Sequence, residues 1–155
     1  MEDEEKLEKE IVPLVAKYCS QSEHCSPDVR KKIKELGGHS LMAERIIGRL
    51  EKEKFLDDAR YVRAYVREKF SINKWGRIKM EYYLKMKGLP QPVIEIGFSE
   101  IDEDQYVKLL VKTMKGKART IRKAGNYEKM GQIIRFAQSR GFEPELIHRY
   151  LSDVI

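Results

Sequence analysis

The chain has 155 residues and a formal net charge of +6, with 36% charged and 41% hydrophobic residues. That length allows one compact domain or a few small repeated units, and the high charged share favours helices with solvated faces over a buried sheet. No apolar run approaches the roughly 20 residues of a membrane span, and no signal-peptide pattern is present, so we expect a cytoplasmic protein.

The first predicted helix contains the phrase IVPLVAKYC, in which Pro13 either opens the helix or kinks it. The stretch before it, MEDEEKLEKE, holds six acids against two lysines. We expect these ten residues to be disordered or to mask a basic patch.

Three glycines mark a repeat along the chain. Gly37, Gly88 and Gly141 are spaced by 51 and 53 residues. Positions four and eight before each glycine, and six, nine, ten and thirteen after it, are apolar or small, which is helical spacing. Each glycine therefore looks like the left-handed end of one helix. Prolines follow where the next helix would begin, namely Pro90, Pro92 and Pro144.

A further helix precedes each of these pairs. In FLDDARYVRAYVREKF, Asp57 and Asp58 stand where a helix start favours a cap and negative charge. The phrase LDDARYV at 56–62 recurs as IDEDQYV at 101–107. Because the acids recur at equivalent positions, we favour caps over a catalytic carboxylate pair or a magnesium site. The buried stripe of this helix is predicted to contain Val62, Tyr65, Val66 and Phe70 or Lys69.

The sequence thus predicts an all-α fold, with three tandem three-helix repeats forming an elongated, curved array. The expected repeats span residues 5–54, 55–101 and 102–155. The last repeat contains a longer basic segment, KGKARTIRKAGN at 115–126. We interpret this segment as a mobile loop or an extended helix end.

Cations gather in two regions of the chain. Residues 60–87 hold nine basic side chains against two acids, and residues 105–135 hold nine against one. In the first region tyrosines and a tryptophan are interleaved with the cations, which suits phosphates and bases. The alternative is that the aromatics are core and the cations a solvated face. We expect Tyr65 and Tyr83 in the core, and Trp75 as a core staple or an exposed anchor.

A surplus of one sign of charge favours a binding surface, because a merely solvated face would mix signs. The predicted binding residues are Arg63, Arg67, Lys69, Lys74, Trp75, Arg77, Lys79, Lys85, Lys112, Lys115, Lys117, Arg119, Arg122 and Lys123.

Catalytic and metal signatures are weak. Cys19 and Cys25 are five residues apart in a pattern unlike that of zinc ligands, so we favour small buried cysteines. The sequence has no phosphate-binding glycine loop and no nucleophile elbow. We therefore expect no enzyme activity, no metal and no cofactor.

FLDDARYVRAYV followed by GRIKMEYYLKMKGL resembles the central signature of the RecX family, regulators of the bacterial recombinase RecA. The residues that fit are Phe55, Leu56, Asp57, Asp58, Arg60, Tyr61, Gly76, Lys79, Leu84, Lys87 and Gly88. Arg77 replaces a proline of the pattern, which leaves the start of its helix open. NKWG and RFAQSRGFEPELI are similar to a Bacteroides-like branch.

The resemblance implies tandem three-helix repeats and a non-enzymatic role in DNA repair and the SOS response. Such proteins bind the RecA filament on single-stranded DNA and inhibit strand exchange, ATP hydrolysis and co-protease activity. We expect a monomer whose cations face the filament, with direct DNA contact left open. Arg60, close to the aspartate pair, is expected to be structural. The competing hypothesis is a stand-alone DNA-binding protein, since three-helix units resemble helix-turn-helix domains.

Overall fold

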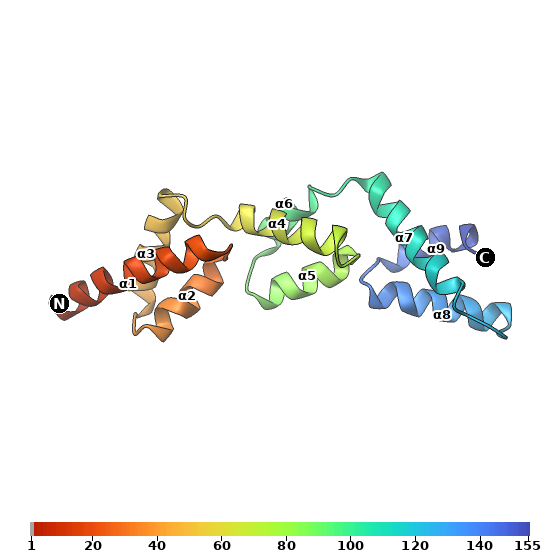
Figure 1. Cartoon of the computed structure of the whole chain (residues 1–155), viewed down its shortest axis with the longest axis horizontal. Helices are drawn as coiled ribbons and strands as arrows, with labels where there is room; N and C mark the ends of the chain where they lie inside the picture. The colour runs from red at the N-terminus through yellow and green to blue at the C-terminus, as the bar shows by residue number, and fades with distance from the viewer. Residues whose placement is uncertain (1) are drawn as a thin grey trace.

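The computed structural model describes residues 2–155, and within them the chain forms nine α-helices, a short 3-10 helix and no strand. The first group is α1 (Glu2–Gln21), α2 (Ser26–Glu35) and α3 (Ser40–Lys52). The second is α4 (Asp58–Ser71), α5 (Arg77–Met86) and α6 (Gln91–Phe98). The third is α7 (Glu103–Ala118), α8 (Asn126–Ser139) and α9 (Pro144–Tyr150), followed by η1 (Leu151–Asp153). Figure 1 shows the three groups along an elongated array, which confirms the predicted architecture of three tandem three-helix repeats.

The repeated glycines end helices as predicted. Gly37, Gly88 and Gly141 have φ values of 96°, 98° and 97°, the left-handed region in which a side chain is disfavoured. The residues four and eight positions before them are all 0% exposed, and they are Val29, Ile33, Met80, Leu84, Ile133 and Ala137. The glycine spacing therefore locates both the turns and the core.

The recurring acids are helix caps. The Asp57 carboxylate accepts a hydrogen bond from the backbone N–H of Arg60 at 3.1 Å, and Asp102 accepts one from Gln105 at 3.0 Å. Each carboxylate thus satisfies a free N–H at the first turn of α4 or α7. This confirms the capping interpretation of these residues.

The acidic beginning of the chain is helical from Glu2 onwards, so the expectation of disorder is wrong for residues 2–10. Glu8 and Glu4 lie 2.9 and 3.5 Å from the guanidinium of Arg45 in α3, an ion pairing that favours the helix. Pro13 lies inside α1 and does not open it. Residue 1 of the acidic stretch lies outside the described residues.

Three clusters of buried side chains form the core, one for each group of helices. Leu56 belongs to the first cluster although it follows α3, and Cys25 belongs to the second although it precedes α2. Neighbouring groups therefore share buried residues, and the exact repeat limits stay a prediction. Both cysteines are free and buried, as predicted, and burial raises the pKa of the Cys25 thiol to about 12.

The first and second groups meet through side chains. The backbone N–H and hydroxyl of Ser26 donate to the Asp58 carboxylate at 2.7 and 2.5 Å. The Lys87 ammonium lies 2.9 Å from Asp28. Carboxylates thus hold this junction, which makes it sensitive to pH.

The second and third groups meet through their backbones as well as through side chains. The N–H of Gly76 donates to the carbonyl of Arg140 at 2.7 Å, and that of Ile78 donates to Gly141 at 2.9 Å. The glycine turn that ends α8 therefore satisfies free N–H groups at the start of α5. A β-carbon at position 76 would clash with the carbonyl of Gly141, so this junction requires glycine.

None of the helices within residues 2–155 combines the length and the apolar character that a membrane crossing needs.

Candidate nucleic-acid interface

A groove lined by cations lies where the α4–α5 link meets α7 and α8. It has a volume of about 460 Å³ and contains no acidic side chain. Its cations come from three segments, with Lys74 from the link, Lys112 and Lys117 from α7, and Arg140 from the end of α8. We call it the basic groove, and its remaining lining residues are Asn73, Thr113, Gly116, Thr120 and Phe136.

One lining residue of the basic groove, Phe136, is aromatic. The Lys117 ammonium and the Arg140 guanidinium lie 5.3 and 4.8 Å from the centre of the Phe136 ring. Cations held over a ring keep their charge while their direction is fixed. Lys74 has φ of 60°, a left-handed conformation that is uncommon for a residue with a side chain.

Two further hollows extend this surface along α7. One, of about 290 Å³, shares Lys74 and Lys112 with the basic groove, adds Lys108, and is also free of acids. The other, of about 450 Å³, is lined by Lys108, Lys112, Lys115 and Arg119 together with Asp153. Lys108, Lys112 and Lys115 are spaced by four and three residues, so their side chains lie on one side of α7.

The segment 115–126 is a helix end only as far as Ala118, where α7 stops, and residues 119–125 form the link to α8. Lys115 and Lys117 are therefore helical, while Arg119, Arg122 and Lys123 lie in the α7–α8 link. None of these five cations has an acidic partner within 4.0 Å in the part of the chain that the structure describes. They remain able to bind an external anion.

A strip of stacked aromatics and lysines follows α4 and α5. Trp75 stacks on Tyr83 with ring centres 5.3 Å apart. The ammonium groups of Lys69 and Lys79 lie 5.0 and 4.6 Å from the Trp75 ring. Trp75 is half-buried in this stack, so it is neither a pure core residue nor a free anchor.

The position of Tyr83 corrects one prediction. This side chain is 41% exposed and not in the core, because it covers Trp75 on the outside of α5. Tyr65, also expected in the core, is half-buried, and burial raises the pKa of its hydroxyl to about 12.

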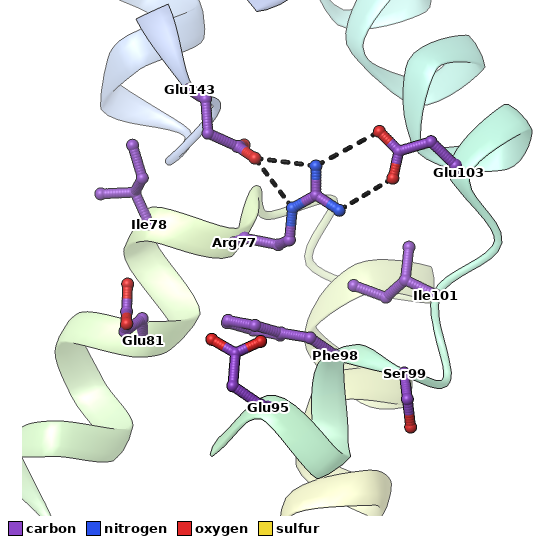
Figure 2. Close-up of a pocket in the computed structure, with 9 residues that line it drawn as sticks. All are labelled: Arg77, Ile78, Glu81, Glu95, Phe98, Ser99, Ile101, Glu103 and Glu143. Carbon is purple, nitrogen blue, oxygen red and sulfur yellow. Dashed lines mark hydrogen bonds and ion pairs between the residues drawn. The ribbon is translucent and has the colours of Figure 1, made fainter. Parts of the chain in front are cut away.

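Arg77, one of the predicted binding residues, is half-buried and paired with acids of the third group. Figure 2 shows its guanidinium between Glu103 and Glu143, which it contacts at 2.9 and 2.8 Å. The guanidinium also stacks 3.9 Å from the centre of the buried Tyr106 ring, whose hydroxyl donates to Glu143. Burial lowers the pKa of Arg77, but the two carboxylates outweigh it and raise the pKa overall, while the hydrogen bond from Arg77 lowers the pKa of Glu103. These contacts join α5 to α7 and α9.

The pocket beside Arg77 has the opposite character to the basic groove. It has a volume of about 550 Å³, and the residues drawn in Figure 2 include four glutamates, namely Glu81, Glu95, Glu103 and Glu143. Phosphates would be repelled from such a lining. Across residues 2–155, no group of three or more acidic, histidine or cysteine side chains is arranged to hold a metal ion.

Some of the other predicted binding residues on α4 and α5 pair with an acidic side chain, and others do not. Arg63 lies 3.3 Å from Glu100, and Lys85 lies 3.4 Å from Glu81, both at the surface. Arg67 donates to the carbonyl of Arg63 at 3.2 Å. Arg60 is structural, as predicted, because it pairs with Glu23 at 2.9 Å and donates to the carbonyls of Lys54 and Phe55.

Sequence reasoning missed part of the groove. Arg140 and Phe136 lie in α8 or at its end, 60 residues and more from the α4–α5 link, and no local pattern indicates that they approach this link. Lys108 was counted only among the nine basic residues of positions 105–135. The signal that could have found Arg140 is its position directly before the repeat glycine Gly141.

Comparisons with known proteins agree with this fold. The family model described as "RecX, second three-helix domain" matches residues 57–96. Regulatory protein RecX of Prosthecochloris aestuarii is 24% identical over 139 residues, covering 89% of each chain. That of Clostridium acetobutylicum is 32% identical over 85 residues, covering 54% of this chain and 39% of the relative. That of Clostridium tetani is 28% identical over 144 residues, covering 90% and 64%.

Two solved structures share the architecture. The crystal structure of RecX from Lactobacillus salivarius superposes with a TM-score of 0.89 at 18% identity, covering 99% of this chain and 98% of that one. A crystal structure of regulatory protein RecX gives a TM-score of 0.86 at 18% identity, covering 97% and 74%. At this identity the likeness concerns the fold.

The fold and the site define a tandem three-helix-repeat protein that carries an acid-free cationic groove. More narrowly, the chain is similar to RecX proteins, through the family model over residues 57–96 and through the relatives over most of its length.

Proposed function

We propose that this protein is a non-enzymatic regulator that binds the RecA filament on single-stranded DNA and inhibits its recombinase, ATPase and co-protease activities. It acts as a cytoplasmic monomer in DNA repair and the SOS response and needs no cofactor. The proposal rests on the similarity to RecX proteins together with the basic groove.

The observation that carries the proposal is the absence of acids from the basic groove. Lys74, Lys112, Lys117 and Arg140 converge on about 460 Å³ with no carboxylate among the lining residues. Neutralising such cations with phosphates releases counterions and favours association. The array itself is elongated, which suits contact along a polymer (Figure 1).

A filament offers both protein and phosphates, whereas bare DNA offers phosphates alone. We therefore expect weak binding to bare single strands and much tighter association with RecA filaments. The stand-alone DNA-binding hypothesis is supported by the same groove and by the exposed ring of Tyr83 beside Trp75.

The two proposed functions predict different preferred binding partners and a different dependence of binding on salt. Binding of the labelled protein to a bare oligonucleotide and to a RecA filament on that oligonucleotide is measured at physiological salt. Direct binding to single strands weakens with a log–log slope of roughly −0.7 per neutralised phosphate. At least tenfold tighter binding to the filament supports regulation of RecA, while equal affinities support the stand-alone function and contradict the proposal.

A further inference from the structure

Helix α5 exposes an apolar stripe that the fold does not use. Ile78, Tyr82 and Met86 follow one another at intervals of four residues, and they are 45%, 59% and 67% exposed. The opposite face of the same helix carries Met80 and Leu84, which are 0% exposed in the second core cluster. Helix α5 is therefore apolar on both its buried and its outer face. We call the outer stripe the α5 ridge.

The composition of the α5 ridge fits a protein partner better than a nucleic acid. Contiguous exposed apolar side chains mark interaction sites, and aromatic residues and methionine are enriched at protein interfaces. Methionine adapts its shape to an irregular apolar surface. A phosphate backbone gains nothing from Ile78 or Met86, so the ridge and the basic groove suit different classes of ligand.

Charge indicates what surrounds the partner's apolar surface. Helical spacing places Lys79 on one edge of the α5 ridge and Lys85 on the other. Lys85 pairs with Glu81 at 3.4 Å across one helical turn, and an exposed pair of this kind contributes little, so Lys85 stays available. Ile78, at the start of the ridge, also lines the pocket of four glutamates, so the lysines flank Tyr82 and Met86 only. A complementary groove would carry carboxylates on the two rims beside Tyr82 and Met86.

We propose that the α5 ridge docks into an apolar, acid-rimmed groove on a protein subunit of the filament, in the manner of a helix laid into a groove. This inference rests on the proposed function and deepens it, because it assigns the protein contact to α5 and the phosphate contact to the basic groove.

The first test is the double variant Tyr82→Ala/Met86→Ala. Both side chains are more than half exposed, so the fold should persist, and a circular dichroism melt checks this. The matched control is Leu14→Ala/Leu41→Ala, which removes two side chains that are 52% and 69% exposed in the first group of helices. The ridge variant should bind filaments at least tenfold more weakly but bare single strands within twofold of the wild type, and the control should match the wild type in both.

Unchanged filament affinity of the ridge variant overturns this inference. The proposed function then still stands if Lys112→Glu/Lys117→Glu loses filament binding, and it fails if the wild-type protein does not bind filaments at all. The two failures are therefore distinguishable.

The second test identifies the occupant. A benzophenone side chain is placed at position 82, and the protein is irradiated with filaments assembled on labelled DNA. An adduct with the recombinase subunit supports the inference. An adduct with the DNA, or with a second copy of this chain, contradicts it.

Discussion

Residues 2–54 and residues 102–155 each fold into three helices around a buried core, and each contains eleven lysines and arginines. The first region balances them with twelve acids, whereas the third has seven. All three arginines of the first region pair with acids of that region at 3.2 Å or less, and they are Arg30, Arg45 and Arg49. None of the five arginines of the third region has such a partner among the residues that the structure describes.

The difference shows how one repeat plan serves two purposes. Charges that pair within a unit leave little net field around it, so the first region acts mainly as scaffold. Cations without partners repel one another in the free protein, and they gain when an anion neutralises them. The contrast between the two regions therefore points to the third as the binding region.

The largest expected effect is on binding, from Lys112→Glu/Lys117→Glu. Reversing two cations of the basic groove should weaken association with filaments and with single strands at least tenfold, and should make the salt dependence shallower. The matched control, Lys17→Glu/Lys31→Glu, makes the same change of charge at two exposed lysines of the first region. Titrations at several salt concentrations check both variants. An equal loss in the control would remove the contrast between the regions.

Next in size is a loss of stability from Gly76→Ala. The new β-carbon would clash with the backbone of Gly141 and Phe142, so we expect the free energy of unfolding to fall by about 3 kcal/mol. In Gly48→Ala, within α3, the β-carbon meets no atom within 4 Å, and we expect a gain of about 0.5–1 kcal/mol. Urea unfolding measures both. Equal stabilities of the two variants would mean that the contact between the second and third groups of helices accommodates a β-carbon at position 76.

A smaller loss is expected from Tyr106→Phe. The Tyr106 hydroxyl accepts from the N–H of Arg77 at 2.9 Å and donates to Glu143, in a side chain that is 0% exposed. Leaving these two groups without a partner should cost about 2 kcal/mol. Tyr61→Phe, at the equivalent repeat position, should cost less than about 1 kcal/mol, because Tyr61 is only half-buried. Thermal melts measure both variants. A melting temperature of Tyr106→Phe equal to or above that of Tyr61→Phe would contradict the expected order.

The smallest effect is a pH dependence of stability that arises where the first and second groups of helices meet. Burial raises the pKa of Asp28, but hydrogen bonds from Lys87 and Cys25 outweigh it and hold the pKa below its ordinary value of 3.8. The stabilisation from this carboxylate is therefore present above pH 3.8 and is lost as the pH falls through its lower value in the folded protein. Asp28→Asn should be less stable than the wild type at pH 7, with a gap that narrows towards pH 3. Urea unfolding across this range measures the gap, and a constant gap would contradict the assignment.

Local patterns predicted the fold well. The glycine spacing located the turns at Gly37, Gly88 and Gly141, and the recurring acids located the caps at Asp57 and Asp102. These features depend on residues within one or two helical turns, which a sequence displays directly. The cations Arg67, Lys69 and Lys79 are likewise displayed directly by the sequence.

The site was predicted only in part, because it depends on how the repeats stack. The pairing of Arg77 with Glu143 joins residues 66 positions apart, and the approach of Arg140 to Lys74 also crosses the second junction. Neither follows from helical spacing. Tyr83 was misplaced because one helix, α5, is apolar on two faces, and periodicity alone does not say which of them is buried.

The most direct test of the account is RecA-dependent ATP hydrolysis on single-stranded DNA, measured while this protein is titrated in. We expect the wild-type protein to reduce the turnover in a saturable manner, and the Lys112→Glu/Lys117→Glu variant to need at least tenfold more protein for the same reduction. Turnover that stays constant at every concentration of the wild-type protein, or an equally potent variant, would contradict the claim that the unpaired cations of the third region bind the filament.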